Sequence, residues 1–216
     1  MYIPDTFRES DVNVQHDFIE RNSFGLLVTQ SVTQPATQSS GSLIATHLPF
    51  VLDRSLAPYG VLSGHMARAN SQWQGFADQD CLIVFSGPHC YVSPSWYETE
   101  NMVPTWNYVA VHAYGKVEAV EDHAELLSIL RRSVELYESS MPKPWTLGES
   151  NLFIERMLLQ IVGFRIKIER LEGKWKLSQN HPENRRQKVV HALELQGDEN
   201  SVAIAELMKT RSRDSR

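Results

Sequence analysis

The chain has 216 residues, of which 42% are hydrophobic and 22% are charged, so it can bury a core and is not expected to be disordered. A formal net charge of -5 argues against a surface adapted as a whole to the phosphate backbone of nucleic acids, although it is compatible with a local basic patch. No apolar run approaches the roughly 20 residues that span a bilayer, the opening residues lack the pattern of a signal peptide, and the two cysteines suggest no disulfide framework. We therefore expect a soluble, cytoplasmic protein.

The first 120 residues predict strands joined by turns. A short helix over residues 9–22 precedes the strands, and residues 30–41, rich in Ser, Thr and Gln, predict a loop. We expect strands at residues 24–29, 42–52, 60–65, 82–85 and 103–120. Pro49 lies inside the second of these strands, and because it cannot donate a hydrogen bond to the ladder it implies a bulge or an unpaired edge.

The hydrophobic pattern changes to helical spacing after residue 120. We expect helices at residues 121–139, 150–160, 183–195 and 200–209. Between them, residues 164–168 predict a strand with one charged face, which turns at residues 172–173 and returns over residues 174–177 as a hairpin. About seven strands with the helices clustered late predict an antiparallel sheet curled into a barrel, and the lack of a GxGxxG after a strand argues against a doubly wound fold.

The sequence offers no strong motif for a catalytic nucleophile or a metal site. Ser63 lies one position too late for the GxSxG elbow of serine hydrolases. Four histidines fall on or near predicted strands without HxH or HExxH spacing: His47, His65, His89 and His112. We therefore expect no protein-bound metal and assign no catalytic residue.

Residues 63–71 predict an anion site. A strand ending in Gly64 is followed by His65, Arg68 and Asn70 at a helical start, where side-chain donors and backbone N–H groups gather. The forked donors of Arg68 suit a phosphate group. The alternative is that Arg68 and Asn70 only cap and solvate the turn.

Aromatic rings and small hydroxyl side chains alternate over residues 82–97 and 103–114. Strands of this composition can line a pocket for a flat ligand with polar edges, although aromatic residues also suit any pleated, half-buried surface. Residues 176–182 end a strand with a polar cluster of the kind that frequently meets a ligand. The alternative is that Asn180 merely caps the following helix.

Taken in order, these segments resemble the PaiB family of FMN-binding split-barrel proteins. The matching pieces cover nearly the whole chain: MYIP with Phe7 at the start, ATHLPF (45–50), GHMARAN (64–70), YVSPSWY (91–97), VPTWNY (103–108) and KLSQN (176–180). The resemblance implies a mainly β fold with helices, namely a six-stranded antiparallel split barrel similar to those of pyridoxamine-phosphate oxidases and flavin reductases. It implies a single domain over residues 1–216, with helical segments at about 121–160 and 182–210, that pairs as a homodimer with FMN in the groove between subunits.

The resemblance also suggests which residues bind the FMN. Arg68 and Asn70, with His65 nearby, are expected to hold the phosphate, and Thr46, His47 and Leu48 are expected to run under the isoalloxazine and to bond its pyrimidine edge through the backbone. The facing subunit is expected to cover the ring with Trp106, Asn107 and Tyr108. The rim of the site is expected to be closed by Lys176, Ser178 and Gln179.

Three functions remain open on the sequence. The resemblance implies a negative transcriptional regulator of sporulation and degradative-enzyme genes, a role that belongs to few members, or a flavin-based sensor. The alternatives are an FMN-dependent oxidoreductase, which needs no dedicated catalytic residue because the flavin does the chemistry, and a haem-handling protein with His181 or His89 as the iron ligand. Direct DNA binding has weak support, because the residues from 183 onward carry a net charge of only +1.

Overall fold

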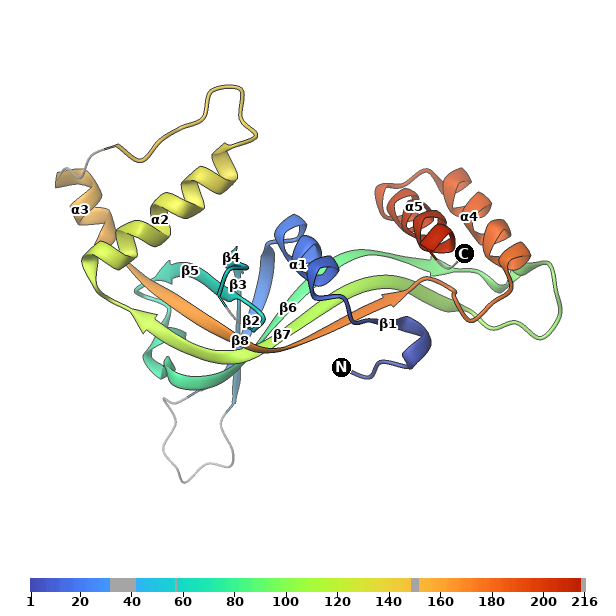
Figure 1. The fold of residues 1–216 in the computed structure, drawn as a ribbon, viewed down its shortest axis with the longest axis horizontal. Helices are drawn as coiled ribbons and strands as arrows, with labels where there is room; N and C mark the ends of the chain where they lie inside the picture. The colour runs from blue at the N-terminus through green and yellow to red at the C-terminus, as the bar shows by residue number, and fades with distance from the viewer. Residues whose placement is uncertain (32–41, 57, 149–151, 215–216) are drawn as a thin grey trace. The chain divides into compact units, whose positions relative to one another are not determined.

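The computed structural model describes residues 1–31, 42–56, 58–148 and 152–214 (Figure 1). The described residues form two compact units, and three strands contribute residues to both. We call them the barrel unit (Val12–Phe85 and His112–Leu171) and the terminal unit (Met1–Asp11, Ser86–Val111 and Glu172–Arg216). The loop predicted over residues 30–41 lies almost entirely outside the described residues, as does the start of the helix predicted at residues 150–160.

The barrel unit is built on a sheet with the strand order β3-β2-β6-β7-β8-β5-β4. The strands are β2 (Phe24–Gln30), β3 (Leu43–Pro49), β4 (Val51–Asp53), β5 (Val61–Ala67), β6 (Ala77–Val92), β7 (Thr105–Val120) and β8 (Ile161–Lys176). The pairings of β2 with β3 and β6, and of β5 with β4 and β8, are antiparallel. The barrel unit also holds α1 (Val12–Arg21), a 3-10 helix η2 (Ser71–Gly75), α2 (His123–Glu138) and α3 (Leu152–Leu158).

The two ends of this strand order belong to one continuous stretch of chain. β3 pairs with β2 and β4 pairs with β5, and Phe50 alone separates β3 from β4. The strand order therefore returns to its starting point, which closes the sheet into a barrel. This order holds seven strands, one more than the six that the resemblance implied, because the strand that was expected over residues 42–52 is interrupted by a bend at Phe50, directly after Pro49.

Large rings fill the core beside this bend. The Phe50 ring packs edge-on against Phe85 and Phe164, with ring centroids 5.6 and 5.7 Å apart. Gly64 lies opposite, and a Cβ placed there would come within 2.6 Å of the Phe164 ring and 2.8 Å of the Pro49 carbonyl oxygen. A glycine at this position of β5 is therefore what lets the bent strand approach so closely.

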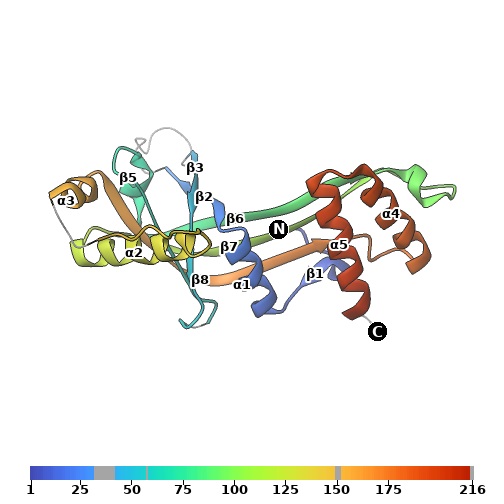
Figure 2. The same ribbon diagram turned by 90° about the horizontal axis from the view of Figure 1, so that it is seen from above.

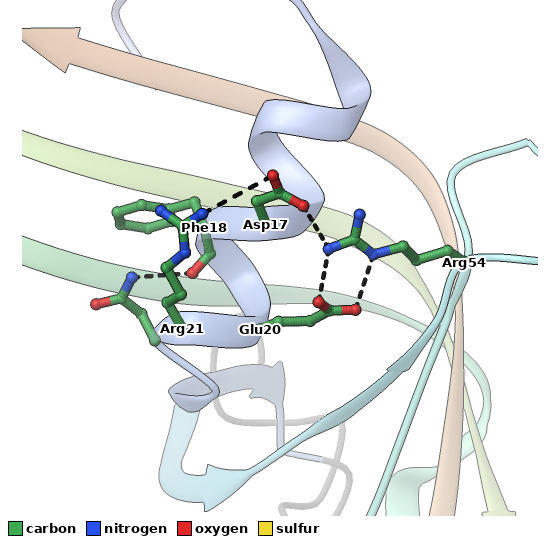
Figure 3. A network of polar contacts seen from close by, with 6 residues as sticks. Asp17, Phe18, Glu20, Arg21 and Arg54 are labelled. Atoms are coloured by element: carbon green, nitrogen blue, oxygen red, sulfur yellow. Dashed lines mark hydrogen bonds and ion pairs between the residues drawn. The ribbon is translucent and has the colours of Figure 1, made fainter. Parts of the chain in front are cut away.

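Helix α1 fixes the turn between β4 and β5. It buries Phe18 and Ile19 and presents two acids to Arg54. The Arg54 Nε donates to Glu20 at 2.8 Å, and Nη2 donates to both Asp17 and Glu20 at 2.6 Å (Figure 3). This forked pairing raises the pKa of Arg54 further above its usual value, chiefly through the hydrogen bond to Glu20.

The terminal unit carries the two C-terminal helices. α4 (Glu183–Gln196) and α5 (Glu199–Asp214) lie side by side in both views (Figures 1 and 2) and join at Gly197, whose φ of 71° ends α4 in the left-handed conformation. Their buried apolar residues form part of the unit's core: Val189, Leu193, Ile204 and Met208. The unit also holds the 3-10 helices η1 (Asp5–Phe7) and η3 (Pro94–Tyr97) and the short strand β1 (Arg8–Glu9).

Two sequence predictions about strands are wrong. The hairpin expected at residues 172–173 does not form, because β8 continues through Gly173 and Lys174 and pairs there with β1. The N-terminal strand supplies a ladder partner at the position where the Gly signalled a turn. Likewise β6 extends far beyond the predicted residues 82–85 in both directions.

Candidate functional site

The residues expected to bind FMN are divided equally between the two units. The barrel unit holds Thr46, His47, Leu48, His65, Arg68 and Asn70, and the terminal unit holds Trp106, Asn107, Tyr108, Lys176, Ser178 and Gln179.

A hydrogen-bonded polar cluster joins β3 to the segment after β5. The Asn70 side-chain amide donates to the Thr46 hydroxyl at 3.0 Å, and that hydroxyl donates to Gln72 Oε1 at 2.6 Å. Gln72 is only 3% exposed, and its Nε2 donates to the Thr29 hydroxyl at 3.0 Å and to the Ile44 carbonyl at 3.3 Å. The structure thus brings together Thr46 and Asn70, which the sequence singled out separately. Sequence reasoning missed Gln72, the hub of the cluster.

The signal for Gln72 lies in a local cap. Asn70 precedes η2 and its Oδ1 accepts a hydrogen bond from the Gln72 backbone N–H at 3.0 Å. An Asn that caps a short helix fixes the residue two positions later, so Gln72 is aimed by Asn70. Asn70 therefore does cap the turn through its Oδ1, which was the alternative to a ligand-binding role. Its amide nitrogen instead donates to Thr46 in the polar cluster.

Strand β3 keeps one edge unpaired in the described part of the chain. Its register partners all lie on β2, so every second backbone N–H and C=O points away from that ladder. Leu48 is buried, whereas His47 is exposed and stacks on the Phe24 ring at 5.8 Å between centroids. The edge of β3 is a row of backbone donors and acceptors beside an aromatic surface.

Arg68 links the two ends of the segment that contains α2 and α3, namely Glu121 before α2 and Leu159 and Ile161 after α3. Its Nε and Nη2 donate to the carbonyls of Leu159 and Ile161, both at 3.2 Å, and its Nη1 pairs with Glu121 at 3.0 Å. The guanidinium also lies over the Trp73 ring, with the Arg68 Cζ 5.5 Å from the ring centroid. Arg68 is therefore a structural brace, and one of its terminal nitrogens already contacts a carboxylate oxygen.

His65 places an unsatisfied polar atom in the barrel unit. Its Nδ1 is buried and has no hydrogen-bond partner among the described residues. Burial lowers the pKa of His65 below its ordinary value of 6.5, because the charged imidazolium loses its hydration there. A buried ring nitrogen without a partner is an open position for a ligand donor or acceptor.

In the terminal unit, Asn107 and Ser178 bond to each other. The Asn107 amide donates to the Ser178 hydroxyl at 3.0 Å, and that hydroxyl donates back to Asn107 Oδ1 at 3.2 Å. Asn107 is completely buried, Ser178 nearly so, and Tyr97 lies 3.4 Å from the same hydroxyl. Ser178 adopts a φ of 61°, a conformation this network sustains.

The other polar residues near the end of β8 also serve the backbone. Lys176 donates to the Thr105 hydroxyl and the Trp106 carbonyl, both at 2.5 Å. Burial, and then the charge of Lys174, lower the pKa of Lys176. Gln179 accepts from the Leu177 N–H at 2.7 Å and donates to the Trp175 carbonyl at 2.5 Å, which shapes the turn.

Trp106 and Tyr108 line an aromatic hollow of about 300 Å³ in the terminal unit. Ser86, Gly87, His89, Val109 and Ala110 complete its lining. Trp106 is 53% exposed and lies 6.3 Å from the His89 ring and 6.0 Å from the Tyr91 ring. This aromatic face is exposed in the described chain.

Solved structures with the same fold define the class of protein. A flavocytochrome from Azotobacter vinelandii superimposes with a TM-score of 0.56 at 14% identity over 78% of this chain and 69% of that chain. A conserved hypothetical protein from Mycobacterium tuberculosis gives a TM-score of 0.55 at 15% identity over 85% of this chain and 95% of that chain. These likenesses show the fold of the chain, a split barrel.

Sequence comparison supplies the family. The profile described as "Putative FMN-binding domain" matches residues 1–170. The Protease synthase and sporulation protein PAI 2 of Bacillus subtilis is 40% identical over 97% of both chains, and an uncharacterized protein of Emericella nidulans is 32% identical over 98% of this chain and 97% of its own. The chain belongs to this family, the PaiB family of FMN-binding split-barrel proteins. No described helix is long and apolar enough to cross a membrane.

The residues of the barrel unit fit FMN. The unpaired edge of β3 suits the donors and acceptors of a pyrimidine edge, the unsatisfied Nδ1 of His65 is open to a ligand, and Arg68 already holds an oxyanion. Thr46 and Asn70 add a hydroxyl and an amide. FMN needs this combination, since it joins a flat ring with a polar edge to a phosphate.

The burial of His65 predicts a pH-dependent stability. As the pH falls below about 6.5, the unfolded chain binds a proton at His65 that the folded barrel does not bind, so the free energy of unfolding falls by up to about 1.4 kcal/mol per pH unit from this group. His65→Gln should reduce that slope in urea unfolding of the flavin-free protein between about pH 8 and about pH 5. Part of the slope should remain, because the pKa of His112 is lowered by burial as well.

His191, exposed on α4, is the matched control for this measurement. His191→Gln should leave the slope of the wild type unchanged. Equal slopes for His65→Gln and the wild type would mean that His65 takes up its proton equally well in the folded and unfolded states.

Proposed function

We propose that the chain is a flavin-based sensor with a regulatory role, and that its FMN binds across β3 and the segment after β5. The observation that carries the proposal is the hydrogen bond between Asn70 and Thr46, which joins two segments of the family pattern within one polar cluster. Bound FMN would supply reversible two-electron redox chemistry. The protein's own part is to bind the cofactor and to respond to its state.

Individual residues take the following roles in this proposal. The backbone of Thr46, His47 and Leu48 bonds the pyrimidine edge, supported by the unpaired edge of β3. Arg68 and Asn70 hold the phosphate, with His65 contributing its open Nδ1. The phosphate takes the place of Glu121 at Arg68 Nη1, because a solvent-exposed ion pair is weak and a phosphate carries more charge than a carboxylate.

Two variants with opposite expected effects test the role of Arg68. Arg68→Ala should weaken FMN binding about 10- to 150-fold, the equivalent of roughly 1.5–3 kcal/mol for a charge-assisted hydrogen bond. Glu121→Gln should strengthen it by up to about fivefold, because the flavin no longer competes with the carboxylate. The measurement is the Kd from quenching of flavin fluorescence.

Glu125→Gln is the control, since Glu125 pairs with Arg165 at 3.1 Å and not with Arg68. It should leave the Kd unchanged. If Arg68 is only a structural brace, Arg68→Ala will lower the stability of the flavin-free protein while Glu121→Gln leaves FMN binding unaltered, and the phosphate role must be abandoned.

We further propose that the protein is a homodimer and that Trp106 and Tyr108 of the facing subunit cover the ring. The exposed aromatic face around Trp106, Tyr91 and His89 supports this arrangement, because such faces mark interaction surfaces. Asn107 and Ser178 support the strand ends that carry these rings, since their buried side chains hydrogen-bond to each other. Lys176 and Gln179 act in the same way on the backbone at the rim.

Sedimentation tests the dimer. Trp106→Ala should weaken self-association at least about tenfold, because a large exposed ring at the centre of an interface is a typical hot spot, and it should weaken FMN binding in parallel. Trp145→Ala is the matched control, since Trp145 is equally exposed but lies in the barrel unit. A wild-type protein that is monomeric at micromolar concentration and still binds FMN would refute the shared site.

A regulatory role is supported by the name of the Bacillus subtilis relative, which refers to protease synthesis and sporulation. The ion pairing of α4 and α5 argues against their direct use as a DNA surface. Four of their cations pair with acids of the same unit: Arg186 with Glu183, Lys188 with Glu98, Lys209 with Glu194 and Glu206, and Arg211 with Glu9. Charges neutralised in this way contribute little to phosphate binding.

We also propose that the protein is located in the cytoplasm.

Visible absorbance of the purified protein separates the sensor from its alternatives. We expect the bands of oxidised flavin, and we expect no steady consumption of NAD(P)H when oxygen is the acceptor. Rapid multiple-turnover oxidation of NAD(P)H would instead establish an FMN-dependent oxidoreductase. A Soret band would establish the haem alternative, with His181 or His89 as the ligand to mutate.

A further inference from the structure

A hollow in the barrel unit lies between α2 and the strands β4, β5 and β8. Its volume is about 350 Å³, and none of the residues expected to bind FMN lines it. Its lining consists of Asp53, Leu56, Val61, Ser63, Ser128, Ile129, Arg132 and Arg165. α2 rests on the barrel through its buried Leu126 and Ile129, and the hollow is the space left beside that contact.

The lining carries two guanidinium groups and one carboxylate. Arg132 Nη2 donates to Asp53 at 3.3 Å, and Arg165 Nη1 donates to Glu125, outside the lining, at 3.1 Å. Each guanidinium thus uses one terminal nitrogen for an ion pair, and its other two nitrogens have no acceptor among the described residues. Asp53 is occupied further by Ser55, whose backbone N–H and hydroxyl both donate to Oδ1.

Ser63 adds a poorly satisfied hydroxyl to the same lining. Its side chain is only 4% exposed, and its one hydrogen bond, to the Val51 carbonyl, is 3.5 Å long. Hydroxyl hydrogen bonds are normally 2.7–2.8 Å long, so this contact satisfies the group weakly. Ser63 is the register partner of Arg165 on β8, which places the hydroxyl and the guanidinium on neighbouring strands at the same level.

We propose that this hollow binds a small organic oxyanion, a phosphomonoester or a carboxylate with a short carbon chain. The free guanidinium nitrogens of Arg132 and Arg165 can donate to the oxygens of such a group, and the hydroxyls of Ser63 and Ser128 supply further donors. Leu56, Val61 and Ile129 provide an apolar wall for the carbon chain. The ligand would bridge α2 and β8, so its binding should stabilise the barrel unit against unfolding.

The test uses the FMN-saturated protein in phosphate-free buffer. Inorganic phosphate, glycerol 3-phosphate and butyrate are titrated separately by calorimetry and by thermal unfolding, with sodium chloride at matched ionic strength as the reference. We expect saturable binding of glycerol 3-phosphate or butyrate at one site per chain, with a rise in Tm beyond that caused by chloride. Preference between the two identifies the phosphate or the carboxylate class.

Variants locate the site. Arg132→Met and Arg165→Met should each weaken binding at least about tenfold, as expected for loss of a charge-assisted hydrogen bond. Arg131→Met, a change in the neighbouring residue on α2 that does not line the hollow, should leave the affinity within about twofold. Arg132→Lys, which keeps the charge but not the fork, serves if Arg132→Met fails to fold, and it should weaken binding as well.

Three results would overturn the proposal. They are the absence of saturable binding tighter than ~10 mM for both organic anions, an unchanged affinity in the Arg132 and Arg165 variants, and binding that occurs only when FMN is left out. Binding only without FMN would mean that the anion occupies the binding site of the flavin phosphate. If the protein binds no FMN, which its absorbance reveals, the titration of the flavin-free protein decides the matter independently of the proposed function.

Discussion

The bend at Phe50 is the constraint on which the barrel depends. The stretch from Leu43 to Asp53 supplies both ends of the strand order, so the sheet closes only if the chain turns between β3 and β4. The turn is secured by the Phe50 ring in the core and by Gly64, where any side chain would collide with the Pro49 carbonyl. Closure brings β3 near the segment after β5, and only then can Thr46 and Asn70 form their hydrogen bond.

Three buried polar side chains, Gln72, Asn107 and Ser178, have hydrogen-bond partners within their own unit before any ligand is considered. Gln72 satisfies a hydroxyl and a backbone carbonyl in the barrel unit, and Asn107 and Ser178 satisfy each other in the terminal unit. Such networks are rigid, because breaking one bond leaves a buried group without a partner. The side chains of Thr46 and Asn70 are therefore held in a fixed arrangement, as are those of Asn107 and Ser178.

Apolar periodicity is local, so the sequence alone predicted the antiparallel barrel with about seven strands, and Pro49 signalled an irregularity where β3 ends. The sequence prediction failed at residues 172–173, where a Gly next to charged residues is typical of a turn and the pairing with β1 is a contact across more than 160 residues. Distance along the chain also hid the partners of Lys176 and Ser178. These partners, Thr105, Trp106 and Asn107, lie 70 or 71 residues away, and side-chain type does not reveal a partner so distant.

Three arginines of the barrel unit share one arrangement: Arg68, Arg132 and Arg165 each give a single terminal nitrogen to a partly exposed carboxylate. Such a pair orients the guanidinium at little energetic gain, so a ligand with more charge can displace the carboxylate. The three arginines differ in whether their other guanidinium nitrogens already have hydrogen-bond partners. Arg68 has committed Nε and Nη2 to backbone carbonyls, so it can offer an anion a single nitrogen. Arg132 and Arg165 each use one terminal nitrogen for their ion pair, and among the described residues their other two nitrogens have no acceptor. Arg68, which lies in the GHMARAN segment of the family pattern, therefore has fewer donors for an anion than Arg132 or Arg165. Any contribution of Arg68 to anion binding depends on neighbouring donors whose positions are fixed by the closure of the barrel.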